Sequence, residues 1–197
     1  MPEARETISG EVPIEGVAQT TGSVRVTPLG LDARFSLRLH AEVAARVGAV
    51  EGFQLDLAIN RCAMSHGRLS ARLGPNEWLL IGRPADSECL GDDLAGALGE
   101  VFHSIVDIGH RDIAIIVEGP YAREILNAAG PLDLCNAAFP AGAATRTLFG
   151  KSEIVLLRPT AEPAFFVECW RSFAPYVLGL LEDAASEFDS PQSDQRS

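Results

Sequence analysis

The sequence predicts an α+β fold built from two similar halves, each consisting of a strand, a helix, a further strand, a hairpin and a second helix. Three observations indicate this duplication. Helices with the same spacing of apolar residues close both halves. Each half has a hairpin with a glycine near its turn, Gly74 in the first and Gly150 in the second. Each of these glycines is followed three residues later by a glutamate, Glu77 or Glu153.

Length and composition fit one compact unit. A chain of 197 residues with 47% apolar residues can bury a sizeable core. We expect residues 31–184 to form this core as two pseudo-repeats, of about 31–104 and 105–184.

Both ends of the chain differ from this middle region. Residues 1–30 scatter glycine, proline, threonine and glutamate without a sustained period, which predicts a largely irregular extension. Val24 and Val26 could form a short edge strand within it. Residues 185–197 are polar and acidic, so they have too little apolar area to offset the entropy of ordering. They predict a disordered tail.

In the first half, alternating apolar residues predict strands at 35–39 and 53–59, with a helix over 41–47 between them. A hairpin follows, in which strands at 69–73 and 78–81 flank a Gly-Pro-Asn turn. The closing helix opens near Ser87, and its apolar residues are spaced at i, i+4, i+7, i+8 and i+11: Leu90, Leu94, Ala97, Leu98 and Val101.

The second half opens with a run at 113–117 that is apolar on both faces, which is typical of a buried strand. Pro120 suits the first turn of the helix that follows. Gly130 is expected to end that helix in the left-handed conformation, and Pro131 cannot continue it. The stripe of this helix consists of Ala122, Ile125, Leu126 and Ala129.

The second half then continues through a long connection at 131–144, a hairpin at 145–158 and a strand at 165–170. Ser172 is expected to cap the last helix, and Pro175 lies in its first turn. The apolar stripe of this helix matches that of the first half: Phe173, Val177, Leu180, Leu181 and Ala184.

Charge excludes two classes of partner. The formal net charge of −11 argues against nucleic acid and anionic membranes, because both require clustered lysine or arginine. No apolar run approaches the roughly 20 residues that cross a bilayer. The N-terminus is acidic where a signal peptide would be basic and then apolar, so the sequence predicts a cytoplasmic protein.

The usual catalytic motifs are missing. The sequence has no nucleophile elbow, no phosphate-binding loop, no H-E-x-x-H motif and no dinucleotide fingerprint. His110, in the string DIGHRD, could be a base oriented by Asp107 or Asp112, or part of an ordinary polar turn. Because the pattern offers no nucleophile nearby, the turn is favoured. We predict no catalytic residue.

Metal binding is also not supported. Cys62 and His66 have a spacing that a metal could use, but a closed zinc site needs four ligands and no second pair is present. The four cysteines contain no C-x-x-C pair, which favours reduced and mostly buried side chains. We therefore predict no metal site.

A different kind of site is suggested by the string VECWRSFAPYV at a strand-to-helix junction. It concentrates residue types that dominate protein interfaces. An alternative is that the tryptophan and phenylalanine are core residues and that the arginine is a surface charge. Apolar residues of the connection at 132–144 are further candidates. The predicted contact residues are Trp170, Arg171, Phe173, Tyr176, Leu134 and Phe139.

The strings themselves resemble a known family. RLGPNEWLLIG at 72–82 and the segments at 107–134, 145–158 and 168–182 resemble the gamma subunit of heterotetrameric sarcosine oxidase. The resemblance covers roughly residues 30–185 in the right order and leaves both tails unexplained.

This resemblance implies a fold similar to the folate-binding domain of the glycine-cleavage aminomethyltransferase. It also implies an assembly with alpha, beta and delta subunits, chiefly with alpha. Such an assembly oxidises sarcosine with oxygen to glycine and hydrogen peroxide, and passes the methyl carbon to tetrahydrofolate as 5,10-methylenetetrahydrofolate. In the family FAD and FMN are associated with beta and its contact with alpha, NAD and the folate site belong to alpha, and zinc belongs to delta. Gamma holds no cofactor.

One departure limits the comparison with folate enzymes. Their acidic residue lies in an Asn-Asp or Gly-Asp-Asp context, but Gly91-Asp92-Asp93 here opens a surface helix, where carboxylates favour the helix dipole. No folate-binding residue is transferred. We therefore expect a non-catalytic structural subunit of sarcosine oxidase. The alternatives are the gamma subunit of an N-methylglutamate dehydrogenase-type complex and a stand-alone protein that binds folate between its halves.

Overall fold

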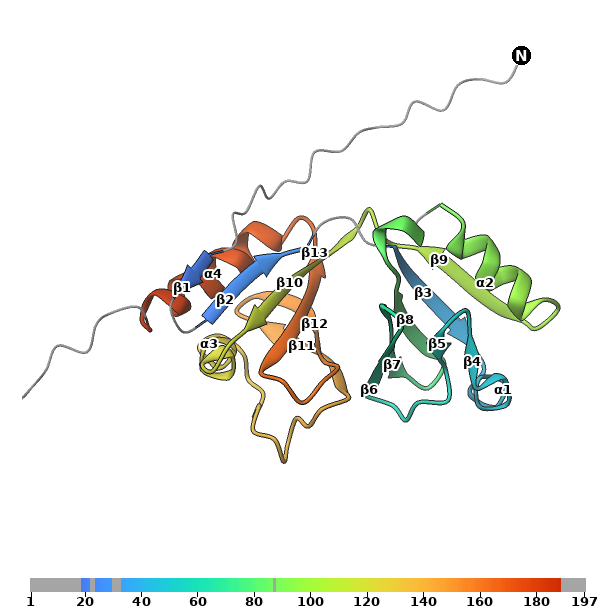
Figure 1. The fold of residues 1–197 in the computed structure, drawn as a ribbon, viewed down its shortest axis with the longest axis horizontal. Coiled ribbons are helices and arrows are strands. Elements are labelled where there is room, and N and C mark those ends of the chain that lie inside the picture. Colours follow the sequence, from blue (N-terminus) through green and yellow to red (C-terminus); the bar gives the residue numbers. More distant parts are fainter. Residues whose placement is uncertain (1–18, 22–23, 30–32, 87, 189–197) are drawn as a thin grey trace, which may run out of the picture.

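The computed structural model describes residues 19–21, 24–29, 33–86 and 88–188. Eleven strands form one curved sheet in the order β1-β2-β10-β13-β12-β11-β6-β7-β8-β3-β9, and all paired neighbours are antiparallel (Figure 1). The sheet bends into two halves that are joined where β6 pairs with β11. Helices lie against each half, so the molecule has two sheet-and-helix units side by side.

The first unit follows the predicted order with some differences. Its strands are β3 (Arg34–Leu39), β6 (Arg61–Ser65), β7 (Arg68–Gly74), β8 (Glu77–Ile81) and β9 (His103–Asp107). Its helices are α1 (Ala41–Val47), α2 (Leu90–Leu98) and the 3-10 turn η1 (Pro84–Asp86), and a small separate ribbon consists of β4 (Ala49–Val50) and β5 (Phe53–Gln54).

The second unit also includes the N-terminal strands. Its strands are β1 (Gln19–Thr21), β2 (Val24–Pro28), β10 (Asp112–Glu118), β11 (Ala143–Phe149), β12 (Ser152–Arg158) and β13 (Ala164–Trp170). Its helices are α3 (Ala122–Asn127) and α4 (Ala174–Ser186). The strand predicted at Val24 and Val26 is present, but it lies between β1 and β10 and not at the edge.

The strand order confirms a duplicated α+β fold and adds an exchange between the halves. β3 lies between β8 and β9, and β10 lies between β13 and β2. β2 precedes β3 in the chain but pairs with β10, whereas β9 precedes β10 but pairs with β3. Each repeat therefore gives its leading strand to the sheet of the other, which ties the two halves together more firmly than a single linker would.

Three apolar clusters follow from the two faces of this sheet. The helices α1 and α2 cover the outer face of the first unit, where Phe35, Leu37, Trp78 and Leu80 are buried. The helices α3 and α4 cover the outer face of the second unit. The inner faces meet in a third cluster between the units: Cys62, Leu69, Ala71, Leu79, Ile108, Ala144 and Leu157.

A buried ion pair joins the same inner faces. The Nε of Arg34 on β3 lies 2.8 Å from Oε2 of Glu168 on β13, and its Nη2 lies 3.4 Å from Oε1. The two side chains are 0% and 3% exposed. Removing a charged side chain from water costs free energy, and in a buried pair this cost is offset mainly by the attraction between the two charges.

One strand prediction is wrong. The run at 53–59 forms a strand only at Phe53–Gln54, and the next strand is β6, which the alternation did not indicate. Phe53 and Leu55 are nevertheless fully buried, so their alternation reports packing and not strand pairing. The signal for β6 was the dipeptide at its turn: His66 and Gly67 have φ of 51° and 77°, as a tight hairpin requires.

The proposed equivalence of Gly74 and Gly150 is also wrong. By strand order, β11 and β12 correspond to β6 and β7, and not to β7 and β8. Gly150 has φ of 57° in the turn between β11 and β12, whereas Gly74 is the last residue of β7 and pairs with Glu77 across the next turn. The turn at Gly67 is therefore the counterpart of the turn at Gly150.

Three details of helix ends complete the corrections. Gly130 does not adopt positive φ, and a Cβ there would lie 2.7 Å from the carbonyl oxygen of Leu126, so close approach explains this glycine. Phe173 and not Ser172 is the cap residue of α4, without a side-chain hydrogen bond, while Pro175 does lie in the first turn. The expected helix start at Ser87 lies outside the described residues.

Candidate functional site

Aromatic side chains gather where β13 ends and α4 begins. Along β13, Phe165, Val167 and Cys169 point into the core of the second unit, and alternation turns Glu168 and Trp170 towards the other face. Glu168 is covered there, whereas Trp170, at the end of the strand, is not. We call Trp170, Arg171, Phe173 and Tyr176 the aromatic junction.

The aromatic side chains of this junction are exposed to an unusual degree. Trp170, Phe173 and Tyr176 are 51%, 40% and 39% exposed. The rings of Trp170 and Phe173 lie 6.3 Å apart at 54°, a tilted arrangement in which each supports the other. Trp170 also borders an open groove of about 700 Å³, with further lining from His110, Arg111, Arg171, Ser172 and Pro175.

Tyr176 has a structural role as well. Its hydroxyl accepts a hydrogen bond of 3.1 Å from the backbone N–H of Lys151. A Cβ at Gly150 would lie 2.5 Å from that hydroxyl oxygen and 2.7 Å from Cδ1 of Leu180. The β11–β12 turn is therefore held on α4, which fixes the position of the junction.

The other two predicted contact residues lie elsewhere. Leu134 and Phe139 are buried in the core of the second unit. The connection folds back on itself there, and the ring of Phe139 stacks on Phe165 at 6.4 Å while its carbonyl accepts a hydrogen bond from Arg158. Both side chains are committed within the chain, so we leave them out of the interface proposed below.

His110 lies in a polar turn, as favoured from the sequence. The carboxylate of Asp107 accepts the N–H of Gly109 at 2.8 Å, and Arg111 donates two hydrogen bonds to Asp112. His110 is exposed and borders the groove beside Trp170. Sequence reasoning identified this turn but did not place it next to the aromatic junction.

A second hollow lies between the two units. It has a volume of about 180 Å³, below the roughly 300 Å³ of most ligand pockets. Glu77 in its lining is paired: it accepts two hydrogen bonds from Arg146, one of 3.1 Å between Oε2 and Nη1, and lies 3.3 Å from Arg38. The hydrogen bond from Arg146 lowers the pKa of Glu77 from its usual value, against the opposing effect of burial.

The buried thiols are poor nucleophiles. Burial raises the pKa of Cys169, which borders this hollow, to about 12, and the negative charges of Glu168 and Asp112 act in the same direction. Burial likewise raises the pKa of Cys62 to about 11. Both are protonated at neutral pH, whereas thiol chemistry requires the thiolate. Cys89 and Cys135 are exposed.

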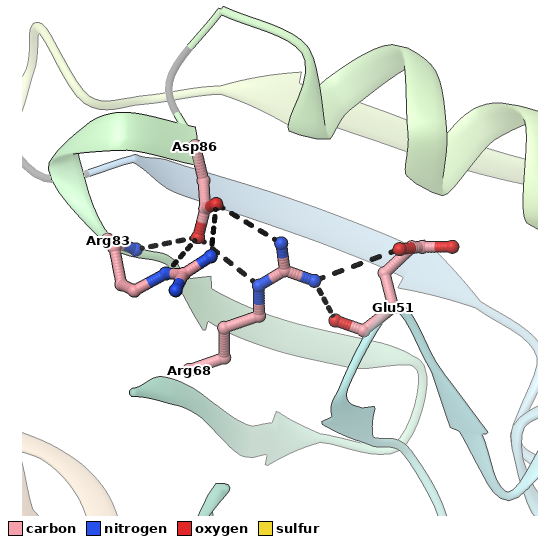
Figure 2. A network of polar contacts seen from close by, with 4 residues as sticks. All are labelled: Glu51, Arg68, Arg83 and Asp86. Carbon is pink, nitrogen blue, oxygen red and sulfur yellow. Dashed lines mark hydrogen bonds and ion pairs between the residues drawn. The ribbon is translucent and has the colours of Figure 1, made fainter. Parts of the chain in front are cut away.

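A polar network of the first unit has a structural role (Figure 2). Asp86 of η1 accepts hydrogen bonds from Arg83 and from Arg68 on β7, and Arg68 also donates to the carbonyl of Glu51. The two arginines hold the pKa of Asp86 well below its usual range, Arg83 having the larger effect. Its carboxylates and the carbonyl of Glu51 are bound by arginines of the same unit, so the network joins η1, β7 and the turn between β4 and β5.

Within the described part of the chain, no group of three or more histidine, cysteine, aspartate or glutamate side chains could hold a metal ion. Cys62 lies inside the sheet with its Sγ 3.2 Å from the carbonyl of Ala143, whereas His66 is exposed at a turn and contacts Ser65. In the same described ranges, no helix has the length and apolar character needed to span a bilayer.

Comparisons with known proteins agree with one another. Residues 39–187 match the model of the sarcosine oxidase, gamma subunit family. The sarcosine oxidase subunit gamma of Corynebacterium sp. strain U-96 is 30% identical over 167 residues, which cover 84% of this chain and 78% of that protein. Its namesake from strain P-1 is 32% identical over 118 residues, which cover 60% and 57%.

Solved structures give the same result. A chain of heterotetrameric sarcosine oxidase from Corynebacterium sp. U-96, in complex with pyrrole 2-carboxylate, matches with a TM-score of 0.78 and 26% identity, over 90% of this chain and 91% of that chain. Glycine cleavage system aminomethyltransferase T from Bartonella henselae matches with a TM-score of 0.63 and 13% identity, over 81% of this chain and 45% of that one. This second likeness concerns the fold alone.

Proposed function

Because the chain belongs to the sarcosine oxidase gamma subunit family, we propose that it is a non-catalytic structural subunit of a heterotetrameric sarcosine oxidase. The complex would oxidise sarcosine with oxygen to glycine and hydrogen peroxide, and pass the methyl carbon to tetrahydrofolate. The partners of this chain are the alpha, beta and delta subunits, and alpha is the main one.

The side chains that line the hollow of about 180 Å³ between the units, called the cleft below, support the non-catalytic role. Glu77 is ion-paired there with both Arg38 and Arg146, and the thiol of Cys169 stays protonated. General acid–base catalysis needs a group that is free to exchange a proton near the working pH. The ion pair between Glu77 and Arg146 instead links the two units.

We further propose that the cofactors of the complex belong to other subunits: FAD and FMN to beta and its contact with alpha, NAD and tetrahydrofolate to alpha, and zinc to delta. Two observations support this for the present chain. The cleft of about 180 Å³ is too small for a dinucleotide or a folate. The residues that the structure describes include no cluster suited to a metal.

The aromatic junction supplies the contact with the partner. Tryptophan, tyrosine and arginine are enriched among the side chains that contribute most to association. Trp170 and Phe173 stand on rigid supports, the end of β13 and the first turn of α4. A partner that fills the groove would cover the ring of Trp170, and the ring of Phe173 lies 6.3 Å from it.

Co-expression tests the structural role. The four subunits are produced together, with and without this chain, and the purified material is measured for subunit composition and sarcosine-dependent peroxide formation. We expect the preparation without this chain to lose assembly and activity together. A stable and fully active complex that forms in its absence would contradict the proposal, and a preference for N-methylglutamate over sarcosine would assign the chain to the related dehydrogenase.

Calorimetry tests the absence of a folate site. Tetrahydrofolate is titrated into the purified chain, and we expect no saturable heat. A saturable signal that disappears in an Arg146→Met variant would place a folate in the cleft and favour a binding protein over a structural subunit.

A further inference from the structure

The two ends of the sheet differ in whether the strand at the equivalent position has a second paired neighbour. β9 forms one end, and among the described residues it pairs only with β3. The N–H of Ile108 donates to the carbonyl of Arg34 at 2.8 Å, so the N–H of Val106 points the same way, towards β3. The alternate N–H groups, which point outwards, belong to His103, Ile105 and Asp107.

The pseudo-equivalent position in the second unit is covered. There β2 takes the place of β9, and the outer side of β2 pairs with β1 from Gln19↔Val26 to Thr21↔Val24. This chain therefore adds a strand to one of two corresponding edges and leaves the other with free backbone donors and acceptors.

The open edge lacks three of the features that usually prevent pairing. Proteins protect exposed edges with lysine, proline or a bulge, but β9 contains no lysine or proline and pairs with β3 in unbroken register. Apolar side chains flank it instead: Phe102, which precedes the strand, is 97% exposed, and Val106 is 51% exposed. An added strand could cover both side chains.

Charge narrows the kind of strand that fits. The arginine opposite Ser104 in β3, Arg38, is ion-paired with Glu77. Between residues 87 and 108 the sequence has no lysine or arginine, and its carboxylates are Glu88, Asp92, Asp93, Glu100 and Asp107. A basic segment is attracted to this edge, whereas β9 of a second copy would bring like charges together.

We propose that the open edge of β9 binds an extended, basic segment of a partner subunit, which pairs with it as an additional strand and covers Phe102 and Val106. This inference rests on the proposed function, because it assumes that the chain works inside an assembly. The turn after β9 carries His110 and Arg111, which border the groove of the aromatic junction, so one partner can reach both surfaces. Strand addition supplies affinity through the backbone, and the flanking side chains supply selectivity.

Hydrogen exchange measured by mass spectrometry tests the pairing directly. The full chain is compared alone and within the co-expressed complex. We expect peptides covering residues 102–107 to exchange quickly in the free chain and to be slowed about 10-fold or more in the complex. Unchanged exchange at 102–107, together with protection at 170–176, would overturn the β9 proposal and leave the proposed function intact. Failure of the wild-type chain to assemble at all would overturn both.

Variants test the side chains and the charge. A Phe102→Asp/Val106→Asp double variant is expected to lower retention of the chain in the complex about 10-fold or more. Met64→Asp is the control, since Met64 is exposed to a similar extent to Val106 but lies on β6, an inner strand. Raising the salt concentration should weaken the wild-type contact. Retention of the double variant at the wild-type level would overturn the proposal.

Self-association is the remaining outcome. If the free chain dimerises as its concentration rises and residues 102–107 become protected, the occupant is a second copy and the proposal of a basic partner segment is wrong. A monomer at all concentrations, with protection only in the complex, supports it. The variants are also checked by thermal unfolding, and we expect midpoints close to the wild type because both side chains are exposed.

Discussion

Replacing Glu168 by glutamine should lower the free energy of unfolding by about 3–5 kcal/mol. The substitution keeps the size and shape of the side chain but removes its charge. Arg34 then remains in the same buried position without this carboxylate, to which it is bound at 2.8 and 3.4 Å. The cost is large because a charge at 0% exposure cannot regain water without disrupting the contact between the units.

A surface pair in the same protein provides the control. Arg25 and Glu118 are 2.9 Å apart, nearly the same separation, but their side chains are 55% and 40% exposed. Water already solvates both groups, so Glu118→Gln should cost only about 0–1 kcal/mol. The comparison isolates burial, because the chemistry and the distance are matched.

Equilibrium unfolding in urea measures both variants. The chain has two tryptophans, and Trp78 is fully buried, so fluorescence and circular dichroism report the loss of packing and of secondary structure together. A Glu168→Gln variant within about 1 kcal/mol of Glu118→Gln would refute the reasoning. An Arg34→Met/Glu168→Leu variant separates charge from packing, since apolar replacement of both partners should restore stability to near the wild type.

Three further predictions concern the junction and the cleft. Trp170→Ala should weaken association with the partner subunits by about 2 kcal/mol, roughly 30-fold in Kd, while the unfolding midpoint of the free chain stays unchanged; an unchanged Kd would exclude it from the interface. Gly150→Ala should lower the free energy of unfolding by about 1–3 kcal/mol, because φ is positive there and a Cβ would clash with α4. Gly96→Ala, which has open space around it in α2, should raise the free energy of unfolding by about 0.5–1 kcal/mol, and equal effects of the two variants in urea unfolding would contradict this. The pKa of Glu77 is lowered in the folded chain, so its contribution to stability is present above the ordinary carboxyl pKa of 4.5 and is lost as the pH falls through the folded pKa. Arg146→Met should reduce this loss of stability at acid pH, and an identical dependence of stability on pH in both proteins would refute the reasoning.

Much of the fold could be predicted because local rules applied along most of the chain. The run at 113–117 formed a strand, and Pro175 lay in the first turn of α4. The exchange of leading strands could not be predicted, because β9 is short and its side chains alternate weakly between the core and solvent. Only the long-range pairing of Phe35 with Asp107 and its neighbours makes this segment a strand.

The candidate site was predicted in part for a similar reason. Residue type selected Trp170 and Phe173, because such residues dominate protein interfaces, and both are exposed. The sequence also placed Phe173 in the apolar stripe of the last helix, and that part of the prediction is wrong because its side chain is 40% exposed. The same reasoning selected Leu134 and Phe139, which the structure buries. A connection without periodicity gives no information on which side chains face inwards, and this depends on how Phe139 stacks on Phe165.

The alternation of β13 links the internal contact of the two units with the proposed external contact. Glu168 and Trp170 are two residues apart, so they lie on the same face of the strand, one inside the molecule and one at its surface. The position of Trp170 relative to the first unit therefore depends on the ion pair between Glu168 and Arg34. The turn of residues 109–111 is subject to the same constraint, because it connects the two units. Before the turn, β9 pairs with β3 of the first unit, and within the turn the carbonyl of Arg111 accepts a hydrogen bond of 2.8 Å from the N–H of Arg171 in the second unit. A change that loosens the two units should thus weaken assembly without touching any contact residue, and Glu168→Gln would reveal this as a loss of partner binding at temperatures where the free chain is still folded.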